Sequence, residues 1–180
     1  MADYTYKFNL FGLPPVDMDV LIANSTTMMV GDPVHFEDGD VADRGAATEP
    51  LGGFCVGIVS KNGIPLELVS TDDYDGTYTK GNEGTGQYVA SADNQTDKQV
   101  KARVRVTPGD VYSDVPDADI GTTAGSDSKG YNTDIVTGAN PNPDENTATT
   151  GTAQLAIIGV DPSDSTRGLY MIKESQFLAV

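Results

Sequence analysis

The sequence predicts an all-β protein, a small β-barrel or a sandwich, for two reasons. Short apolar runs alternate with turn signals along most of the chain, as they do in barrels and sandwiches. No window carries an amphipathic helix of ordinary length, because glycine, proline or threonine interrupts every candidate. We therefore expect one β domain over residues 26–180, preceded by an extended arm over residues 1–25. The domain carries long irregular loops and one long acidic insertion at about residues 107–152.

The charge of the chain disfavours two classes of partner. The 180 residues carry a net charge of −16, whereas nucleic acids and anionic membranes attract basic surfaces. The first residues lack the charged and apolar regions of a secretory signal. No apolar run approaches the roughly 18 residues of a membrane span. We therefore expect synthesis and folding in a cytosol, with neither nucleic acid nor membrane as partner.

Residues 1–25 show no sustained periodicity of apolar residues. A run of alternating aromatic residues ends at Pro14-Pro15, because proline and the residue before it disfavour regular structure. We expect an extended arm that pairs with this domain or adds a strand to the exposed edge of a neighbour. The arm residues expected to bind a partner are Tyr4, Tyr6, Phe8 and Phe11.

The strands expected after residue 26 are apolar runs bounded by turns. Asn62-Gly63 is expected to form a type I′ hairpin turn, because that turn needs positive φ at both central residues. The elements are a strand and hairpin over residues 27–41 turning at Asp38–Asp40, a buried strand over Gly52–Ser60, a returning strand over Pro65–Val69, and strands over Gly86–Ala90, Gln99–Val106, Ala153–Val160 and Leu169–Glu174.

Residues 99–106 alternate most cleanly. Apolar residues at even positions predict a buried face, and three basic residues occupy the opposite face. This basic stripe consists of Lys101, Arg103 and Arg105. It has two interpretations: it pairs with acidic loops of this protein, or it is a docking strip for an acidic partner or a neighbouring copy.

The sequence gives little support to a catalytic site or a cofactor site. His35, the only histidine, stands opposite Val34 and Phe36 on a strand, so we expect it to face solvent. Cys55, the only cysteine, lies in an apolar strand and is expected to be inert. Glu67 comes closest to a carboxylate in apolar surroundings, but an outward position on a half-buried strand explains it. We expect no enzymatic activity and no cofactor.

One acidic loop resembles part of a calcium site. Asp72–Gly76 contains suitably spaced carboxylates, but Thr71 and Asn82 occupy the first and twelfth ligand positions, where acidic ligands are needed. An irregular calcium site there, or around Asp161 and Asp164, stays an open question.

Residues 107–152 form a polar tract between two predicted strands. The tract holds eight acidic residues against one basic residue, with six glycines and four prolines. A long insertion of this kind is functional, disordered, or ordered by something outside the chain. We expect ordered irregular chain that contacts a neighbouring protein through sparse apolar residues. These residues are Ile120, Tyr131, Ile135 and Val136.

Five segments rich in glycine, threonine, aspartate and β-branched residues are similar to segments of a known family. They are Val30–Val34, the turn at Phe36–Gly39, Asp119–Asp127, Gly130–Val136 and Gly151–Pro162. Together they resemble the capsid decoration, or cement, proteins of tailed bacteriophages. The resemblance implies a small barrel with a tulip-like core and no catalysis. It also implies a homo-oligomer, often a trimer, that binds the major capsid protein on the outer surface of the virion and stabilises the head.

A second hypothesis is a surface-displayed binding module, resembling a fibre or adhesin domain, that recognises a host glycan. Such a site needs exposed aromatic residues, and the sequence offers one cluster, Tyr74, Tyr78 and Tyr88. Their placement as ordinary β-surface residues is the simpler interpretation. A hydrolase with paired carboxylates is a third hypothesis, for which the sequence indicates no pair.

Overall fold

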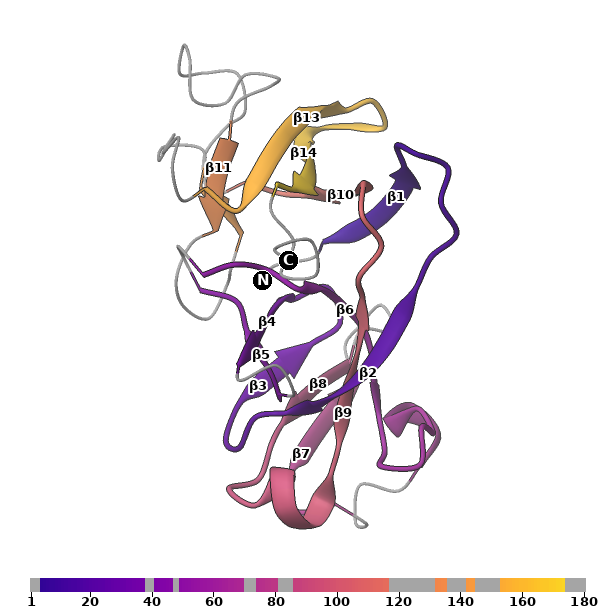
Figure 1. Cartoon of the computed structure of the whole chain (residues 1–180), viewed down its shortest axis with the longest axis vertical. Helices are drawn as coiled ribbons and strands as arrows, with labels where there is room; N and C mark the ends of the chain where they lie inside the picture. The colour runs from indigo at the N-terminus through magenta and orange to yellow at the C-terminus, as the bar shows by residue number, and fades with distance from the viewer. Residues whose placement is uncertain are drawn as a thin grey trace. The chain divides into compact units, whose positions relative to one another are not determined.

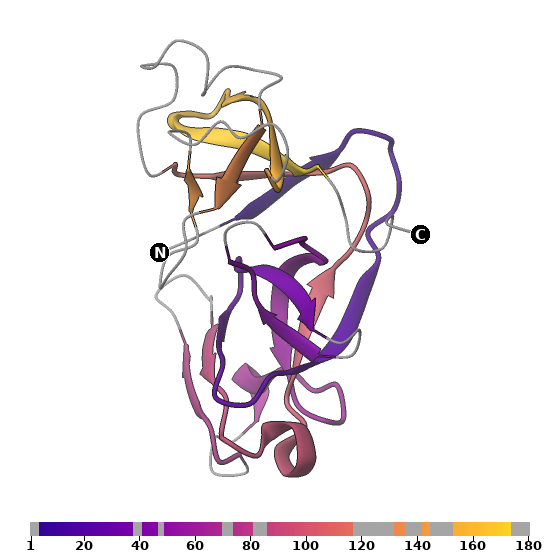
Figure 2. The ribbon, with the colours of Figure 1, turned by 60° about the vertical axis from the view of Figure 1, so that its left-hand side comes forward.

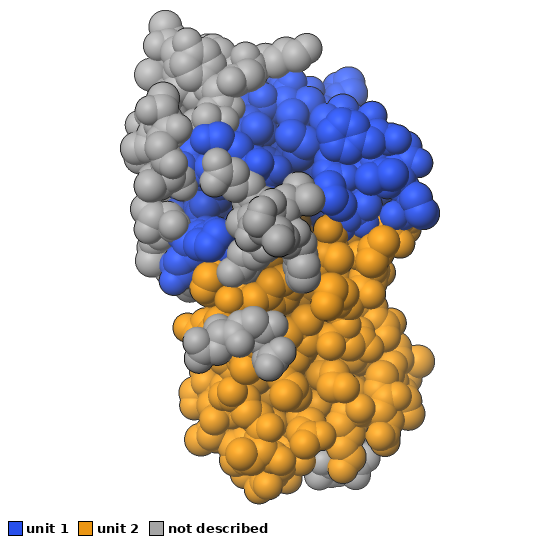
Figure 3. Space-filling model, viewed as in Figure 1, with its two compact units in different colours: residues 1–14, 45–51, 107–180 blue, residues 15–44, 52–106 orange. Residues whose placement is uncertain are grey.

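The chain folds into two compact units, and strands are the main regular structure of the described residues (Figures 1 and 3). The computed structural model describes residues 4–37, 41–46, 49–69, 74–80, 86–116, 132–135, 142–144 and 153–173. Unit 1 comprises residues 1–14, 45–51 and 107–180, and unit 2 comprises residues 15–44 and 52–106. The predicted all-β class with a small barrel is confirmed.

Unit 2 contains a closed barrel of five strands (Figure 2). Around the barrel they are β2 (Asp17–Ile22), β5 (Val41–Arg44), β4 (Pro33–Glu37), β6 (Gly53–Val59) and β9 (Lys101–Arg105). Neighbouring strands are antiparallel except β2 and β5, which are parallel. Closure satisfies the backbone of every strand within the ring, which leaves the barrel without a sheet edge.

The barrel core follows the predicted alternation. Val100, Ala102 and Val104 are fully buried, and the three basic residues between and after them are only partly buried. β6 is buried on both faces at most positions, as its continuous apolar sequence predicts. Both predictions are therefore confirmed.

A three-stranded antiparallel sheet completes unit 2. Its order is β3 (Thr27–Met29), β8 (Gly86–Val89) and β7 (Thr77–Lys80). Met28 and Tyr88, on neighbouring strands of this sheet, are fully buried and pack into the same apolar cluster as the barrel residues. β7 lies between the predicted strands over Pro65–Val69 and Gly86–Ala90, where no strand is expected from the sequence.

Unit 1 is an antiparallel sheet of six strands (Figure 1). In order they are β1 (Thr5–Asn9), β10 (Asp110–Asp114), β14 (Asp164–Ile172), β13 (Leu155–Asp161), β11 (Asn132–Ile135) and β12 (Pro143–Asp144). The largest fully buried side chains of unit 1 are Tyr170, Leu51, Leu155, Ile157 and Ile135.

The predicted arm over residues 1–25 is divided between the two units. Its first part forms β1, which pairs with β10 of this same chain. Its second part forms β2, which pairs with β5 and β9 in the barrel. Met18 and Val20 alternate with Asp17 and Asp19, which is a strand signal, but the prediction of an arm does not use it because Pro14 and Pro15 precede it.

The chain reverses after β6 as predicted, with an antiparallel bridge between Val59 and Pro65, but the predicted turn type is wrong. Gly63 has a positive φ of 78°, but Asn62 does not, so the turn is not type I′. The Ser60 hydroxyl accepts hydrogen bonds from the backbone N–H of both Asn62 and Ile64 and holds a wider loop. The predicted strand over residues 65–69 is a 3-10 turn, η1 (Leu66–Leu68), which buries Leu66 in the core.

The polar tract over residues 107–152 is partly regular. β10, β11 and β12 all lie within it, so the prediction of irregular chain is wrong for those strands. All five residues of β10 are buried, including three polar ones. Ile120, Tyr131 and Val136 lie outside the described residues, as does the predicted turn at Asp38–Asp40.

Asn94 is a fully buried polar residue that links three segments of unit 2. It begins a five-residue π-helical turn, η3 (Asn94–Lys98). Its amide group donates to the carbonyl oxygens of Ile22 and Val100, at 2.7 and 3.0 Å. Its side-chain oxygen accepts from the Val100 N–H and from the Tyr88 hydroxyl. At the end of β2 the Ile22 N–H donates to the Val100 carbonyl, and the Asn94 side chain supplies the partner of the Ile22 carbonyl.

We expect Asn94→Ala to lower the free energy of unfolding by about 3 kcal/mol, because it leaves buried backbone groups without partners. Urea denaturation followed by circular dichroism measures this change. The control is Asn62→Ala, the same substitution at an exposed turn position, where we expect less than about 0.5 kcal/mol. Equal losses in the two variants would contradict the role given to Asn94.

Candidate docking surfaces

Residues 8–13 of unit 1, called here the apolar segment, expose four large apolar side chains. The exposed fractions are 42% for Phe8, 47% for Leu10, 67% for Phe11 and 44% for Leu13. Single exposed apolar residues are common, but four within six residues make this segment a candidate interaction site. The segment starts in β1 and continues into the loop that follows it.

Asn9 fixes the conformation of the apolar segment. Its side-chain oxygen accepts hydrogen bonds from the backbone N–H of Phe11 and of Leu13, at 2.8 and 3.0 Å. Its amide nitrogen donates to the Pro108 carbonyl and to the Asp110 carboxylate, both at 2.8 Å. One half-buried side chain thus ties the loop to the start of β10, and the apolar side chains project from an ordered backbone.

The Phe11 ring packs against Gly109, which has no side chain to block it. Gly109 has a positive φ of 77°, and a Cβ atom built there would lie 2.4 Å from the ring. Its carbonyl oxygen also accepts the Leu10 N–H at 2.9 Å. Phe11 therefore rests against backbone on one side and presents the rest of its surface to solvent. An aromatic side chain held in this way loses little conformational entropy when it binds a partner.

Two of the predicted binding residues in the arm differ from Phe8 and Phe11. Tyr4 is 4% exposed, so the expectation that it contacts a partner is wrong in this structure. Tyr6 is partly exposed and packs edge-to-face on Tyr112, with ring centroids 6.0 Å apart. Pairing of β1 with β10 also means that the arm serves its own sheet.

The basic stripe is neutralised largely within unit 2. Arg103 and Arg105 stand directly opposite Asp19 and Asp17 in the β2–β9 register, and each arginine forms two hydrogen bonds with its aspartate. The hydrogen bonds that Arg103 donates to Asp19 raise the pKa of its guanidinium. Lys101 stands opposite Leu21 instead. The partners are residues of a neighbouring strand, not the acidic loops that the sequence suggested.

The predicted contacts of the polar tract do not form a surface in the described part of the chain. Ile135 is 1% exposed and belongs to the interior of unit 1, so the expectation that it binds a partner is wrong in this structure. Its backbone N–H donates to the side chain of Gln154. Ile120 and Tyr131 lie outside the described residues.

The three tyrosines of the glycan hypothesis do not share an exposed face. Tyr88 is fully buried, and burial raises its pKa to about 12. Tyr74 and Tyr78 are half-buried and pack against the apolar cluster of unit 2. The aromatic cluster seen in the sequence therefore contributes mainly to the interior.

The candidate reactive residues are held in structural positions. Cys55 is buried, and desolvation raises the pKa of its thiol far above the usual range, which suppresses the reactive thiolate. His35 is half-buried on the face of β4 opposite Val34 and Phe36, so it is less exposed than expected. Neither residue has the setting of a nucleophile or a general base.

A polar network in unit 1 surrounds Asp161. The Asp161 carboxylate accepts hydrogen bonds from the hydroxyls of Ser113 and Ser163 and forms an ion pair with Lys7 at 2.9 Å. Arg167 donates to the Ser113 hydroxyl at 3.0 Å. Ser113 is fully buried, so the network lacks the access that a nucleophilic serine needs. We assign it a structural role.

The candidate calcium ligands Asp161 and Asp164 have partners within the protein. Among the described residues, no three histidine, cysteine or acidic side chains are grouped as metal ligands. Asp161 is already occupied by its hydroxyl and lysine partners, and Asp164 accepts bonds from Thr166. Asp72 and Asp73 lie outside the described residues.

Comparison with known proteins identifies no relative: no family model, no curated protein and no solved structure matches the chain. Helices in the described ranges are too short and too polar to cross a membrane.

The Asp161 network predicts a pH-dependent contribution to stability. Hydrogen bonds from Ser163 and Ser113 and the contact with Lys7 hold the pKa of Asp161 well below its ordinary value of 3.8. The contribution is therefore complete above that value and is lost as the pH falls towards the lower pKa of the folded state. We expect Asp161→Asn to cost about 2 kcal/mol of unfolding free energy at pH 7, the usual cost of losing hydrogen bonds to a charged group.

Urea unfolding of the wild type and the variant at pH 7 and pH 3 tests this expectation. The difference in unfolding free energy between the wild type and Asp161→Asn should be smaller at pH 3 than at pH 7. Glu37→Gln, at an exposed position in unit 2, is the control and should show no gap at either pH. A constant gap for Asp161→Asn would contradict an electrostatic role.

Proposed function

We propose that the protein is a non-enzymatic capsid decoration protein of a tailed bacteriophage. It binds the outer surface of the capsid, bridges neighbouring major capsid proteins and stabilises the head. The observation that carries this proposal is the apolar segment, with its four exposed side chains on a loop fixed by Asn9. The resemblance of the sequence to decoration proteins supplies the identity of the partner.

The segment has the properties of an interface anchor. Binding energy at protein interfaces concentrates in a few aromatic or large apolar residues that enter pockets of the partner. Phe11 is the most exposed aromatic residue of the described chain and is held against Gly109 before any partner arrives. Because this side chain is already ordered in the free protein, binding costs less conformational entropy.

The composition supports a role on the surface of a particle. A net charge of −16 keeps free subunits apart and prevents decorated particles from adhering to each other. A protein that binds a folded capsid gains stability from binding, because the unfolded chain does not bind. The proposal places the protein on the virion after synthesis in the host cytoplasm, as a homo-oligomer, in the first instance a trimer.

We expect Phe11→Ala to weaken binding to capsids by at least about 30-fold, the loss typical of a truncated aromatic anchor. The measurement is co-sedimentation of the purified 180-residue chain with expanded capsids that lack a decoration protein. Val160→Ala is the matched control, because Val160 is another exposed apolar residue of unit 1, with 46% exposure. It should bind as the wild type does.

Two results would overturn the proposal. One is failure of the wild-type protein to sediment with capsids, above all if it binds a host glycan instead. The other is equal binding by Phe11→Ala and wild type. Because Phe11 is largely exposed, circular dichroism should show that the variant keeps its fold, so that a loss of binding reports on the interface.

A further inference from the structure

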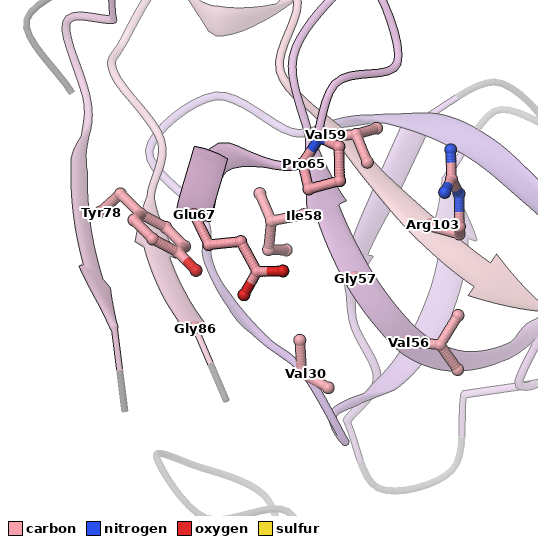
Figure 4. Close-up of a pocket in the computed structure, with 10 residues that line it drawn as sticks. All are labelled: Val30, Val56, Gly57, Ile58, Val59, Pro65, Glu67, Tyr78, Gly86 and Arg103. Atoms are coloured by element: carbon pink, nitrogen blue, oxygen red, sulfur yellow. The ribbon is translucent and has the colours of Figure 1, made fainter. Parts of the chain in front are cut away.

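Unit 2 has a small depression, called here the Glu67 pocket, that the proposed capsid contact does not use. β6, the η1 turn and strands β7 and β8 contribute to its lining (Figure 4). The residues that define it for this argument are Val30, Ile58, Pro65, Glu67, Tyr78 and Gly86. Its volume is about 180 Å³, below the roughly 300 Å³ at which small-molecule pockets begin. The space suits a single side chain of a partner.

The Glu67 carboxylate is uncompensated. It forms neither a hydrogen bond nor an ion pair with any residue in the described part of unit 2, whereas Asp17, Asp19 and Asp75 are each paired with a cation. Arg103 also lines the pocket, but its guanidinium is bound at two points to Asp19. The nearest arginine is therefore committed elsewhere, and the carboxylate is available to a partner.

Tyr78 places a second oxygen beside this carboxylate. Figure 4 shows the phenol oxygen and the Glu67 carboxylate projecting into the same space. Gly86 makes this position possible, because a Cβ atom there would lie 2.1 Å from the phenol oxygen. Burial, and after it the charge of Glu67, raises the pKa of Tyr78, so the phenol stays protonated at neutral pH. Its oxygen can still accept a hydrogen bond.

We propose that the Glu67 pocket binds an arginine side chain of a partner protein. The guanidinium donates to the Glu67 carboxylate and to the Tyr78 oxygen, and its methylene groups lie against Ile58, Val30 and Pro65. Arginine fits two neighbouring acceptors better than lysine does, because its planar fork presents several N–H donors at fixed angles. The negative charge of the whole chain adds a long-range attraction for a basic partner.

This inference goes beyond the capsid proposal and does not depend on it. The Glu67 pocket belongs to unit 2 and the apolar segment to unit 1, and different substitutions remove them. Failure of one leaves the other standing.

The test is an NMR titration of the full ¹⁵N-labelled chain with N-acetyl-arginine methylamide. We expect amide shifts at Ile58, Tyr78 and Gly86 with millimolar affinity. Glu67→Gln keeps the size of the side chain and removes the charge, so we expect about fivefold weaker binding, the usual worth of an exposed ion pair. Glu37→Gln, the same change at another exposed position of unit 2, should bind as the wild type does.

A second variant tests the tyrosine. Gly86→Ala displaces the tip of the Tyr78 ring and should weaken binding without unfolding the chain, which the same spectra verify. N-acetyl-norleucine methylamide, which is uncharged, should cause no shifts at these positions. The proposal is overturned if the arginine derivative causes none, if Glu67→Gln binds it equally well, or if norleucine matches it. N-acetyl-lysine methylamide is titrated in the same way, and tighter binding of this compound than of the arginine derivative would overturn the choice of arginine.

Discussion

The pairing of β9 with β2 is the constraint on which unit 2 depends. β9 also pairs with β6, so it joins the two ends of the five-stranded sheet into a barrel. Its inner face buries Ala102 and Val104, and its outer face places Arg103 and Arg105 opposite Asp19 and Asp17. A slip of one residue would turn both arginines into the core and separate both ion pairs. Apolar packing and charge therefore specify the same register.

The strands of the barrel could be predicted where local pattern and burial agree. The apolar pattern of residues 99–106 and 52–60 matches the burial of these residues in the fold, and both segments form strands close to the expected bounds. β10 could not be recognised, because Ser113 and Asp114 are polar residues buried by distant partners, among them Arg167. The η3 turn depends likewise on Asn94, whose four bonds reach into β2, β8 and the start of β9. A local pattern contains no sign of such partners.

The same limit applies to the docking surfaces. Phe8 and Phe11 follow from the sequence as candidate contacts, because they are aromatic residues in a segment without a core pattern. Tyr4 belongs to the same pattern but is buried, and only the fold distinguishes them. The residues that hold the apolar segment, Asn9 and Gly109, lie about 100 positions apart and give no joint signal in the sequence. Glu67 was singled out as a carboxylate in apolar surroundings, and the structure adds the neighbouring Tyr78.

The acidity of the chain explains how such a surface persists in a free protein. An ordered, exposed Phe11 risks association between copies, because apolar patches attract each other without regard to identity. Like charges on every copy oppose that association. At physiological ionic strength their repulsion reaches about 8 Å, so it acts before apolar side chains come into contact. A partner with basic side chains meets attraction in place of this repulsion. Under the proposed function, the charge of the chain therefore favours a basic partner, and the apolar segment supplies most of the binding energy.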